Sequence, residues 1–270
     1  MISAAPEFHL AGSAFDAIAA SYDARFTTSA IGQAQRQAVW RKAETVFRAG
    51  DRVLELNCGT GADALFLASR GISVTACDAS PRMIEQALAR KSEEAPHAPI
   101  DFRVLCTEQL NRLLPGVRFN GVFSNFSGLN CVTDLRAVAM QLSEVLERGA
   151  QLLLCLSTRF CLWEMLYYAG RGDFRKAFRR CGGSSTVRMG LQSLHVYYPS
   201  VRSLMHCFSP AFRLRSVSGI GVAVPPSYME DWARRHPSIL CLCATTDRML
   251  SSWPFFRVLG DHMLLHLERV

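Results

Sequence analysis

The sequence predicts an α/β fold built on a mostly parallel sheet. Between residues 50 and 157, short apolar segments alternate with helical patterns, which is typical of β-α-β units. One transition, VLELNCGTGADA over residues 53–64, passes from an apolar run through a corner with two glycines into a helical pattern. After Ser157 the alternation stops, which indicates an insertion into one domain.

The size and composition are those of a globular protein. The 270 residues, with 49% hydrophobic and 20% charged side chains, suffice for one sizeable domain, which we expect to span residues 1–270. No apolar stretch approaches the roughly 18 to 20 residues of a membrane span. The first 20 residues lack the basic start and apolar run of a secretory signal. A cytoplasmic location is therefore expected.

Each expected element has its own local signal. The helix at 81–92 is the clearest, because Ser80 can cap it, Pro81 suits its first turn, and Met83 and Ile84 share a face with later apolar residues. Further helices are expected at 61–70 and 134–148. Apolar segments predict strands at 52–57, 73–77, 100–105, 120–125 and 150–157.

The segment after Ser157 changes character. Residues 161–180 read as a helical insertion with bulky aromatics and a basic end, and residues 186–200 alternate like a strand or hairpin. A further strand is expected at 212–224, followed by helices broken at Pro237 and Pro254. The chain closes on a strand-like stretch at 261–270.

The glycine corner predicts a ligand site. Gly59 and Gly61 leave bare backbone amides and a helix start at the carboxyl edge of the sheet, where ligands bind in open α/β folds. The pattern GTGADA, with Asp78 further on, suits the dinucleotide of an NAD(P)-dependent oxidoreductase. It equally suits S-adenosylmethionine, which has ribose hydroxyls but no pyrophosphate. The carboxylate of Glu55 suits an ammonium better than a pyrophosphate, and therefore favours S-adenosylmethionine.

Five segments resemble one protein family. VLELNCGTG followed by VTACDASPRMIEQA resembles the first two motifs of class I S-adenosylmethionine-dependent methyltransferases. FDAIAASYDARF (15–26) is similar to the N-terminal helix of small-molecule members, FNGVFSNFSGLN (119–130) resembles the fourth-strand motif, and GDHMLLHLER (260–269) is similar to the last strand. The chain is thus identified as similar to ubiquinone/menaquinone-type methyltransferases.

This resemblance implies a fold and a cofactor. The fold would be a Rossmann-like, seven-stranded, mostly parallel sheet with helices on both faces. Residues 1–50 would form a helical cap, and residues 158–200 a small substrate-side lid after the fifth strand. The cofactor would be S-adenosyl-L-methionine, and the enzyme would move its methyl group to O, N or C of a small, aromatic or hydrophobic molecule. The alternatives are an oxidoreductase and a non-catalytic, cofactor-binding partner subunit.

The resemblance also implies a set of cofactor-binding residues. Asn57 departs from the family pattern, which usually has glycine there, and Cys106-Thr107 departs from a common Asp-Ala pair that contacts adenine. The adenine contact is therefore expected from backbone atoms, Thr107 or Glu108. The implied sites are Glu55, Asn57, Gly59 and Gly61 at the methionine end, Asp78 on the ribose, Ala79 and Met83 along the adenosine, Cys106 and Thr107 near the adenine, and Asn125, Phe126 and the covering Tyr22 near the sulfonium.

Several of these residues have plainer alternatives. Asp78 could cap the helix after the second strand, Tyr22 could be a core aromatic, and Met83 could be helix packing. Arg36 could pair with the cofactor's carboxylate, but we expect a solvated helix arginine.

The residues of the insertion indicate which kind of molecule accepts the methyl group. His195, flanked by tyrosines in LQSLHVYYPS, is the candidate general base, and the alternative is an edge-strand histidine; His206 and His262 are weaker candidates. The insertion suits an aromatic, acidic or lipid-like acceptor, or contact with an anionic membrane surface; the alternative is a solvated basic helix. Its aromatic residues are Trp163, Tyr167, Tyr168, Phe174 and Phe178, and its cations are Arg171, Arg175, Lys176, Arg179 and Arg180.

Other partners are not expected. The net charge of +7 is compatible with nucleic acid, but the chain has no recognised binding module and no basic tail. The ten cysteines are scattered without a CxxC pair, so we interpret them as reduced thiols and expect no metal site.

Overall fold

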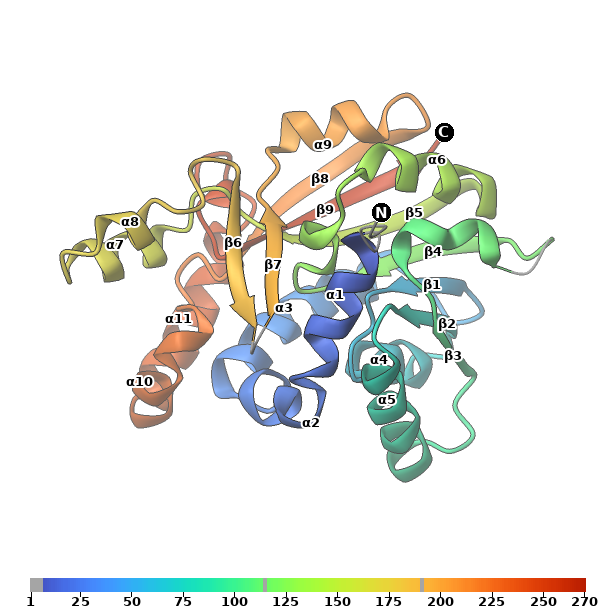
Figure 1. Ribbon diagram of the computed structural model, residues 1–270, viewed down its shortest axis with the longest axis horizontal. Coiled ribbons are helices and arrows are strands. Elements are labelled where there is room, and N and C mark those ends of the chain that lie inside the picture. Colours follow the sequence, from blue (N-terminus) through green and yellow to red (C-terminus); the bar gives the residue numbers. More distant parts are fainter. Residues whose placement is uncertain (1–6, 114–115, 190–191) are drawn as a thin grey trace, which may run out of the picture.

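The central element is a seven-stranded sheet with the order β3-β2-β1-β4-β5-β9-β8 (Figure 1). The computed structural model describes residues 7–113, 116–189 and 192–270. Strands β1 to β5 run parallel, and β9 lies antiparallel between β5 and β8. The predicted Rossmann-like, seven-stranded, mostly parallel sheet is therefore confirmed. Its strands are β1 (Arg52–Leu56), β2 (Ser73–Asp78), β3 (Ile100–Val104), β4 (Phe119–Ser124), β5 (Leu146–Ser157), β8 (Phe212–Ile220) and β9 (His262–Arg269).

Helices cover both faces of this sheet because alternate side chains of the central strand point to opposite sides. Leu54 and Leu56 of β1 join the core under α6 (Leu135–Val145) and α9 (Val201–Phe208). Val53 joins the opposite core, under α3 (Ala30–Val46), α4 (Ala62–Ser69) and α5 (Pro81–Glu94). Both faces of β1 are thus buried, as its near-continuous apolar run requires.

Two predicted boundaries differ from the structure. The helix expected at 134–148 ends at Val145, and β5 begins at Leu146 instead of residue 150. Leu146 pairs with Phe119 of β4, and the register shifts before Gly121 pairs with Gln151. Gly149, with a φ of 81°, lies in this irregular stretch, where a left-handed backbone favours glycine.

Two inserted segments lie beyond the carboxyl edge of the sheet and add no strand to it. Residues 158–200 contain α7 (Leu162–Ala169), α8 (Phe174–Ala177) and the hairpin of β6 (Ser184–Met189) and β7 (Gln192–Tyr197). Between β8 and β9 lie a 3-10 turn (Ser227–Met229), α10 (Glu230–Arg235), α11 (Pro237–Leu250) and a second turn (Phe256–Val258), so a helix boundary falls at the predicted Pro237. None of the helices described is long and apolar enough to cross a membrane.

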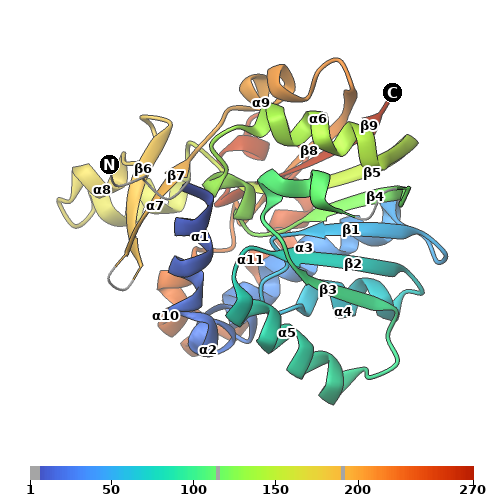
Figure 2. The ribbon, with the colours of Figure 1, turned by 45° about the vertical axis from the view of Figure 1, so that its right-hand side comes forward.

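The N-terminal helices lie across the same edge. Helix α1 (Glu7–Asp16) contacts α5 and β7, and Figure 2 shows it between the β6–β7 hairpin and the sheet. Helix α2 (Ala19–Tyr22) leads into a π-helical turn (Asp23–Thr27) before α3. The hydroxyl of Ser13 donates to Gln192 Oε1 over 2.8 Å, so α1 is joined to the hairpin as well as to the sheet.

Candidate functional site

The corner after β1 is built from left-handed residues. Asn57, Gly59 and Gly61 have φ values of 56°, 53° and 77°. Asparagine tolerates this region better than most residues, which explains why it can replace the family's usual glycine at position 57. At Gly61 a Cβ would lie 2.8 Å from the Phe102 ring and 2.9 Å from Ala87, so only glycine fits.

A cavity opens beside this corner. It lies at the carboxyl edge of β1, β2 and β4 and beneath α1, where ligands bind in open α/β sheets. Four lining residues were not predicted: Gly12, Phe15, Gly128 and Cys131. Eight predicted cofactor residues line it: Tyr22, Asn57, Gly59, Asp78, Ala79, Met83, Asn125 and Phe126.

Asp78 ends β2 and faces the glycine corner. Its Oδ2 accepts the Gly59 amide and its Oδ1 accepts the Ser80 amide, both at 2.9 Å. Ser80, not Asp78, caps α5, because its hydroxyl accepts the Met83 amide at 3.1 Å. Burial raises the pKa of Asp78 to about 6, against the lowering effect of the two amides. Each carboxylate oxygen retains accepting capacity for a hydroxyl in the cavity.

Tyr22 lies over the corner, held by its neighbour. A Cβ on Gly59 would be 3.9 Å from Tyr22 Cε1. Asp23 accepts the Thr60 hydroxyl at 2.6 Å and forms an ion pair with Arg90 of α5. Burial raises the pKa of Tyr22 to about 12, so the ring stays a neutral phenol at neutral pH.

Glu55 is not among the lining residues. Its side chain is 1% exposed, and its Oε2 has no hydrogen-bond partner. Burial raises its pKa well above the usual range. Arg36, expected to be solvated, is instead buried and pairs with Asp63 at 2.5 Å. Trp40 Nε1 and Asn125 Nδ2 also donate to Asp63, so this carboxylate connects α3 and α4 to the end of β4.

Phe126 follows β4 in a left-handed conformation, with a φ of 47°. Such a conformation is strained for a bulky residue and persists only where its surroundings fix it. The Arg36 guanidinium lies 4.8 Å from the ring centroid, and the rings of Phe26 and His262 approach edge-on at 4.8 and 5.5 Å. The aromatic wall of the cavity is therefore held on three sides.

The residues predicted near adenine occupy two environments. Thr107 is buried, and its hydroxyl donates to Asn57 Oδ1 at 3.3 Å, which couples the ends of β3 and β1. Cys106 lines an adjoining open depression that shares Gly12 and Ala79 with the cavity. The site therefore continues past α1 towards the end of β3.

His262, and not the candidate base His195, contacts the cavity wall. His195 is exposed on β7, pairs with Thr186 across the hairpin, and contacts the Tyr197 ring edge-on at 4.7 Å. It is not among the cavity-lining residues. His262, at the start of β9, is buried against Phe126, and burial lowers its pKa so that it is neutral. Its Nδ1 has no hydrogen-bond partner.

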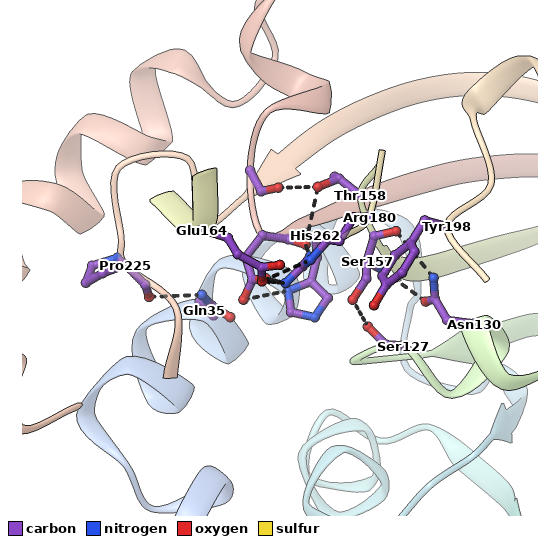
Figure 3. Close-up of polar contacts among 12 residues, drawn as sticks. Gln35, Ser127, Asn130, Ser157, Thr158, Glu164, Arg180, Tyr198, Pro225 and His262 are labelled. Atoms are coloured by element: carbon purple, nitrogen blue, oxygen red, sulfur yellow. Dashed lines mark hydrogen bonds and ion pairs between the residues drawn. The ribbon is translucent and has the colours of Figure 1, made fainter. Parts of the chain in front are cut away.

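Two of the insertion's cations pair with a buried carboxylate: Arg180, itself buried (Figure 3), and Arg179, which is exposed. Glu164 of α7, 1% exposed, accepts Arg179 Nε and Arg180 Nη2, both at 2.7 Å. Arg180 also pairs with Asp261 at 3.0 Å. Arg180 is therefore not available to an acceptor, contrary to the expectation, whereas Arg179 stays exposed beside Glu164. Arg180 joins α7 to the residue before β9.

Asn130 joins the hairpin to the sheet (Figure 3). Its Nδ2 donates to the carbonyls of Ser157 at 3.3 Å and Tyr197 at 2.6 Å, and its Oδ1 accepts the Ser157 amide at 2.9 Å. Ser157 and Ser127 share a hydroxyl hydrogen bond of 2.6 Å. The loop after β4, which lines the cavity, is thereby fixed to both β5 and β7.

The sheet order, the glycine corner and the acidic residue ending β2 together define a class I methyltransferase fold. Residues 53–149 match the family described as "Methyltransferase domain". The resemblance to class I S-adenosylmethionine-dependent methyltransferases is therefore confirmed, and S-adenosylmethionine is the cofactor of that class.

Individual proteins agree with this assignment. A demethylmenaquinone methyltransferase of Clavibacter sepedonicus is 32% identical over 146 residues, which is 52% of this chain and 55% of the relative. The chain thus spans about half the length of the curated relative. Among solved structures, the [4+2]-cyclase SpnF superposes with a TM-score of 0.66 at 14% identity, covering 98% of this chain and 97% of SpnF. The N-methyltransferase NodS of Bradyrhizobium japonicum, solved with S-adenosylhomocysteine, gives 0.60 at 15%, covering 96% and 98%. At these identities the two structures support the fold.

Proposed function

We propose that this protein binds S-adenosylmethionine in the cavity and transfers its methyl group to a small, apolar or aromatic molecule. The observation that carries the proposal is the Asp78 carboxylate, fixed by the amides of Gly59 and Ser80 at the edge of the cavity. A carboxylate held in this way suits a ribose diol, since each oxygen still has a free lone pair.

With the ribose held at Asp78, the other contacts to the cofactor follow. Met83 and Ala79 lie along the adenosine, and the depression beside Cys106 accommodates the adenine edge. Asn57 and Gly59 face the methionine end, with Tyr22 covering them. Glu55, Gly61 and Thr107 act from behind the lining: Gly61 permits the turn, and Thr107 orients Asn57. Glu55 is buried behind the corner with an unpartnered oxygen, and because burial raises its pKa well above the usual range, it does not act as the carboxylate expected to attract the cofactor's ammonium.

Methyl transfer of this kind needs little general acid–base catalysis from the protein. When bound, the cofactor supplies a methyl group on a sulfonium, which leaves by in-line displacement. The residues around it position the acceptor and exclude water. The titratable lining groups are Tyr22, Asp78 and Cys131, and burial raises the pKa of both Tyr22 and Cys131 to about 12. Neither is a base at neutral pH, so positioning dominates.

An acceptor needing a base would meet His262 before His195. His262 is neutral, buried and in contact with Phe126, whereas His195 faces solvent on the hairpin. The acceptor side is otherwise apolar: Phe15, Phe126, Gly128 and Cys131 line it. These side chains favour a hydrophobic or aromatic acceptor. None of the described residues of 158–200 lines the cavity, and the β6–β7 hairpin of this segment packs against α1 and the turn after β4.

A second candidate is a cofactor-binding cyclase, because the fold also superposes on SpnF. Cyclisation and methyl transfer would use the same cavity but differ in what happens to the cofactor. Methyl transfer consumes S-adenosylmethionine and releases S-adenosylhomocysteine, whereas a cyclase leaves the cofactor unchanged.

Two measurements test the proposal. Isothermal titration should give micromolar binding of S-adenosylmethionine and S-adenosylhomocysteine and none of NAD or NADP; the opposite preference would make the corner a dinucleotide site. A screen of apolar and aromatic acceptors with labelled methyl donor should then give labelled product. Tight cofactor binding with product formed and no label transferred would instead favour the cyclase. Tight binding with a stable protein partner and no product would favour a non-catalytic subunit.

A further inference from the structure

Helix α7 presents its apolar residues to solvent and its charged residue to the protein. Leu162 and Leu166, one turn apart, are 37% and 63% exposed. Glu164 between them is 1% exposed and pairs with Arg179 and Arg180. A surface helix of a globular protein normally shows the reverse arrangement, with the apolar stripe facing the core.

Helix α8 repeats this arrangement. Phe174 begins this helix and Phe178 directly follows it, and they are 62% and 47% exposed, while Ala177 is the buried residue of the helix. Figures 1 and 2 show α7 and α8 side by side, projecting from one end of the molecule, and the two helices contact each other closely. The two outward pairs therefore form one apolar projection and not scattered surface residues.

The charges around this projection are positive. Its two acidic residues are already occupied: Glu164 is buried with its arginines, and Asp173 accepts the Lys176 amide at the start of α8 and pairs with its ammonium. Arg171 lies over the Tyr167 ring at 3.6 Å, which holds its guanidinium at the surface. Arg175 is exposed.

The projection is also held rigidly. Arg180 bridges Glu164 to Asp261, next to His262. Tyr167 and Tyr168 pack against Tyr228 at 4.8 and 5.5 Å, which fixes the inner face of α7. The leucines cannot turn inward without breaking a buried ion pair, so their exposure is a property of the folded state.

We propose that this surface docks onto an anionic lipid bilayer. Leucine and phenylalanine side chains would enter the boundary between headgroups and acyl chains, and the flanking cations would pair with lipid phosphates. An isologous contact with a second copy is less suitable, because it would set like charges against each other. The docking surface consists of Leu162, Leu166, Phe174 and Phe178 with Arg171, Arg175 and Lys176.

Docking does not depend on methyl transfer, but it has a consequence for the acceptor. Through Arg180, Asp261 and His262, the surface is joined to Phe126 in the cavity wall. A docked protein would therefore hold its cavity at a fixed orientation to the membrane, from which an apolar molecule can be taken.

Vesicle co-sedimentation tests this docking. The wild-type protein should bind vesicles containing roughly one-third phosphatidylglycerol at least about tenfold more tightly than vesicles of phosphatidylcholine alone, and added salt should weaken binding. Leu166→Ser with Phe174→Ser, and separately Arg171→Gln with Arg175→Gln, should each lower binding about tenfold or more.

Matched controls come from other elements. Met140 on α6 is 63% exposed, like Leu166, and Arg148 is exposed after α6. Met140→Ser and Arg148→Gln should leave vesicle binding unchanged. Titration with S-adenosylhomocysteine should give wild-type affinity in every variant, which shows that each is folded and separates this test from that of the cofactor site.

Several results would overturn the proposal. They are equal binding to both kinds of vesicle, no binding at all, or an equal loss in the Met140→Ser control. A loss caused only by Trp253→Ser with Phe255→Ser would move the docking surface to the other exposed aromatic pair, which is 58% and 70% exposed. A dimer in sedimentation velocity that Leu166→Ser dissociates, without vesicle binding, would make the surface a protein interface.

Discussion

The carboxylate of Asp78 accepts the backbone amide of Gly59 at 2.9 Å, so the ends of β2 and β1 form one polar unit at the mouth of the cavity. Neighbouring parallel strands bring these residues together although nineteen positions separate them in the sequence. The unit has a donor side, the glycine corner, and an acceptor side, the carboxylate, and both face the proposed cofactor.

Replacing Asp78 by alanine should weaken S-adenosylmethionine binding by about 1–3 kcal/mol, because the ribose hydroxyls and the Gly59 amide would lose their acceptor. Isothermal titration measures the change. Asp134→Ala, which removes an exposed cap of α6, is the control and should leave the affinity unchanged. Wild-type affinity in Asp78→Ala would show that the ribose lies elsewhere.

The affinity for S-adenosylmethionine should fall as the pH drops through about 6, where Asp78 of the free protein takes up a proton. Between pH 7 and pH 5 the loss should be about tenfold, if only the carboxylate accepts the ribose hydroxyls. Titrations across this range should show the dependence in wild type and none in Asp78→Asn. A flat wild-type profile would contradict the assignment.

The same pKa shift predicts a stability effect of the opposite sign. The folded pKa of about 6 lies above the ordinary 3.8, so the folded protein holds this proton more tightly than the unfolded chain. The contribution of Asp78 to stability is fully present below pH 3.8 and is lost as the pH rises to about 6. Urea unfolding of the unliganded protein should therefore show that Asp78→Asn becomes more stable relative to wild type over this interval. A constant difference would contradict the shift.

Gly12→Ala should displace α1 from the cavity. A Cβ at this position would lie 2.6 Å from the Ala79 carbonyl oxygen, which belongs to the backbone and cannot move aside. Relieving such an overlap costs about 1–3 kcal/mol, and we expect this cost as weaker cofactor binding. Gly182→Ala, whose Cβ would meet nothing within 4 Å, is the control. Equal affinities in the two variants would show that α1 does not close the site.

Glu164→Ala should lower the free energy of unfolding by about 3–5 kcal/mol, because it leaves Arg180 buried beside only one acidic partner. Urea denaturation measures this quantity. The control is Glu147→Ala, which removes an exposed pair with Arg52 and should cost less than about 1 kcal/mol. Similar losses in both variants would mean that the buried bridge contributes no more than a surface pair.

The sequence by itself determined the sheet, the glycine corner and most of the candidate cofactor residues. These features have local causes: a strand reads as an apolar run, Gly59 and Gly61 mark the turn, and a residue ending a parallel strand must lie at the carboxyl edge. Asp78 and Phe126 could therefore be placed at the edge of the sheet before any contact was known.

Tertiary structure alone decided burial and pairing. Arg36 reads as a surface arginine because its partner Asp63 lies on another helix, and Arg179 and Arg180 read as free cations because Glu164 and Asp261 face them only after folding. Gly12 lines the cavity through a contact of α1 with Ala79 that carries no local pattern. Such roles depend on contacts between segments distant in sequence, and the desolvation and pairing that fix a side chain's charge exist only once those contacts form.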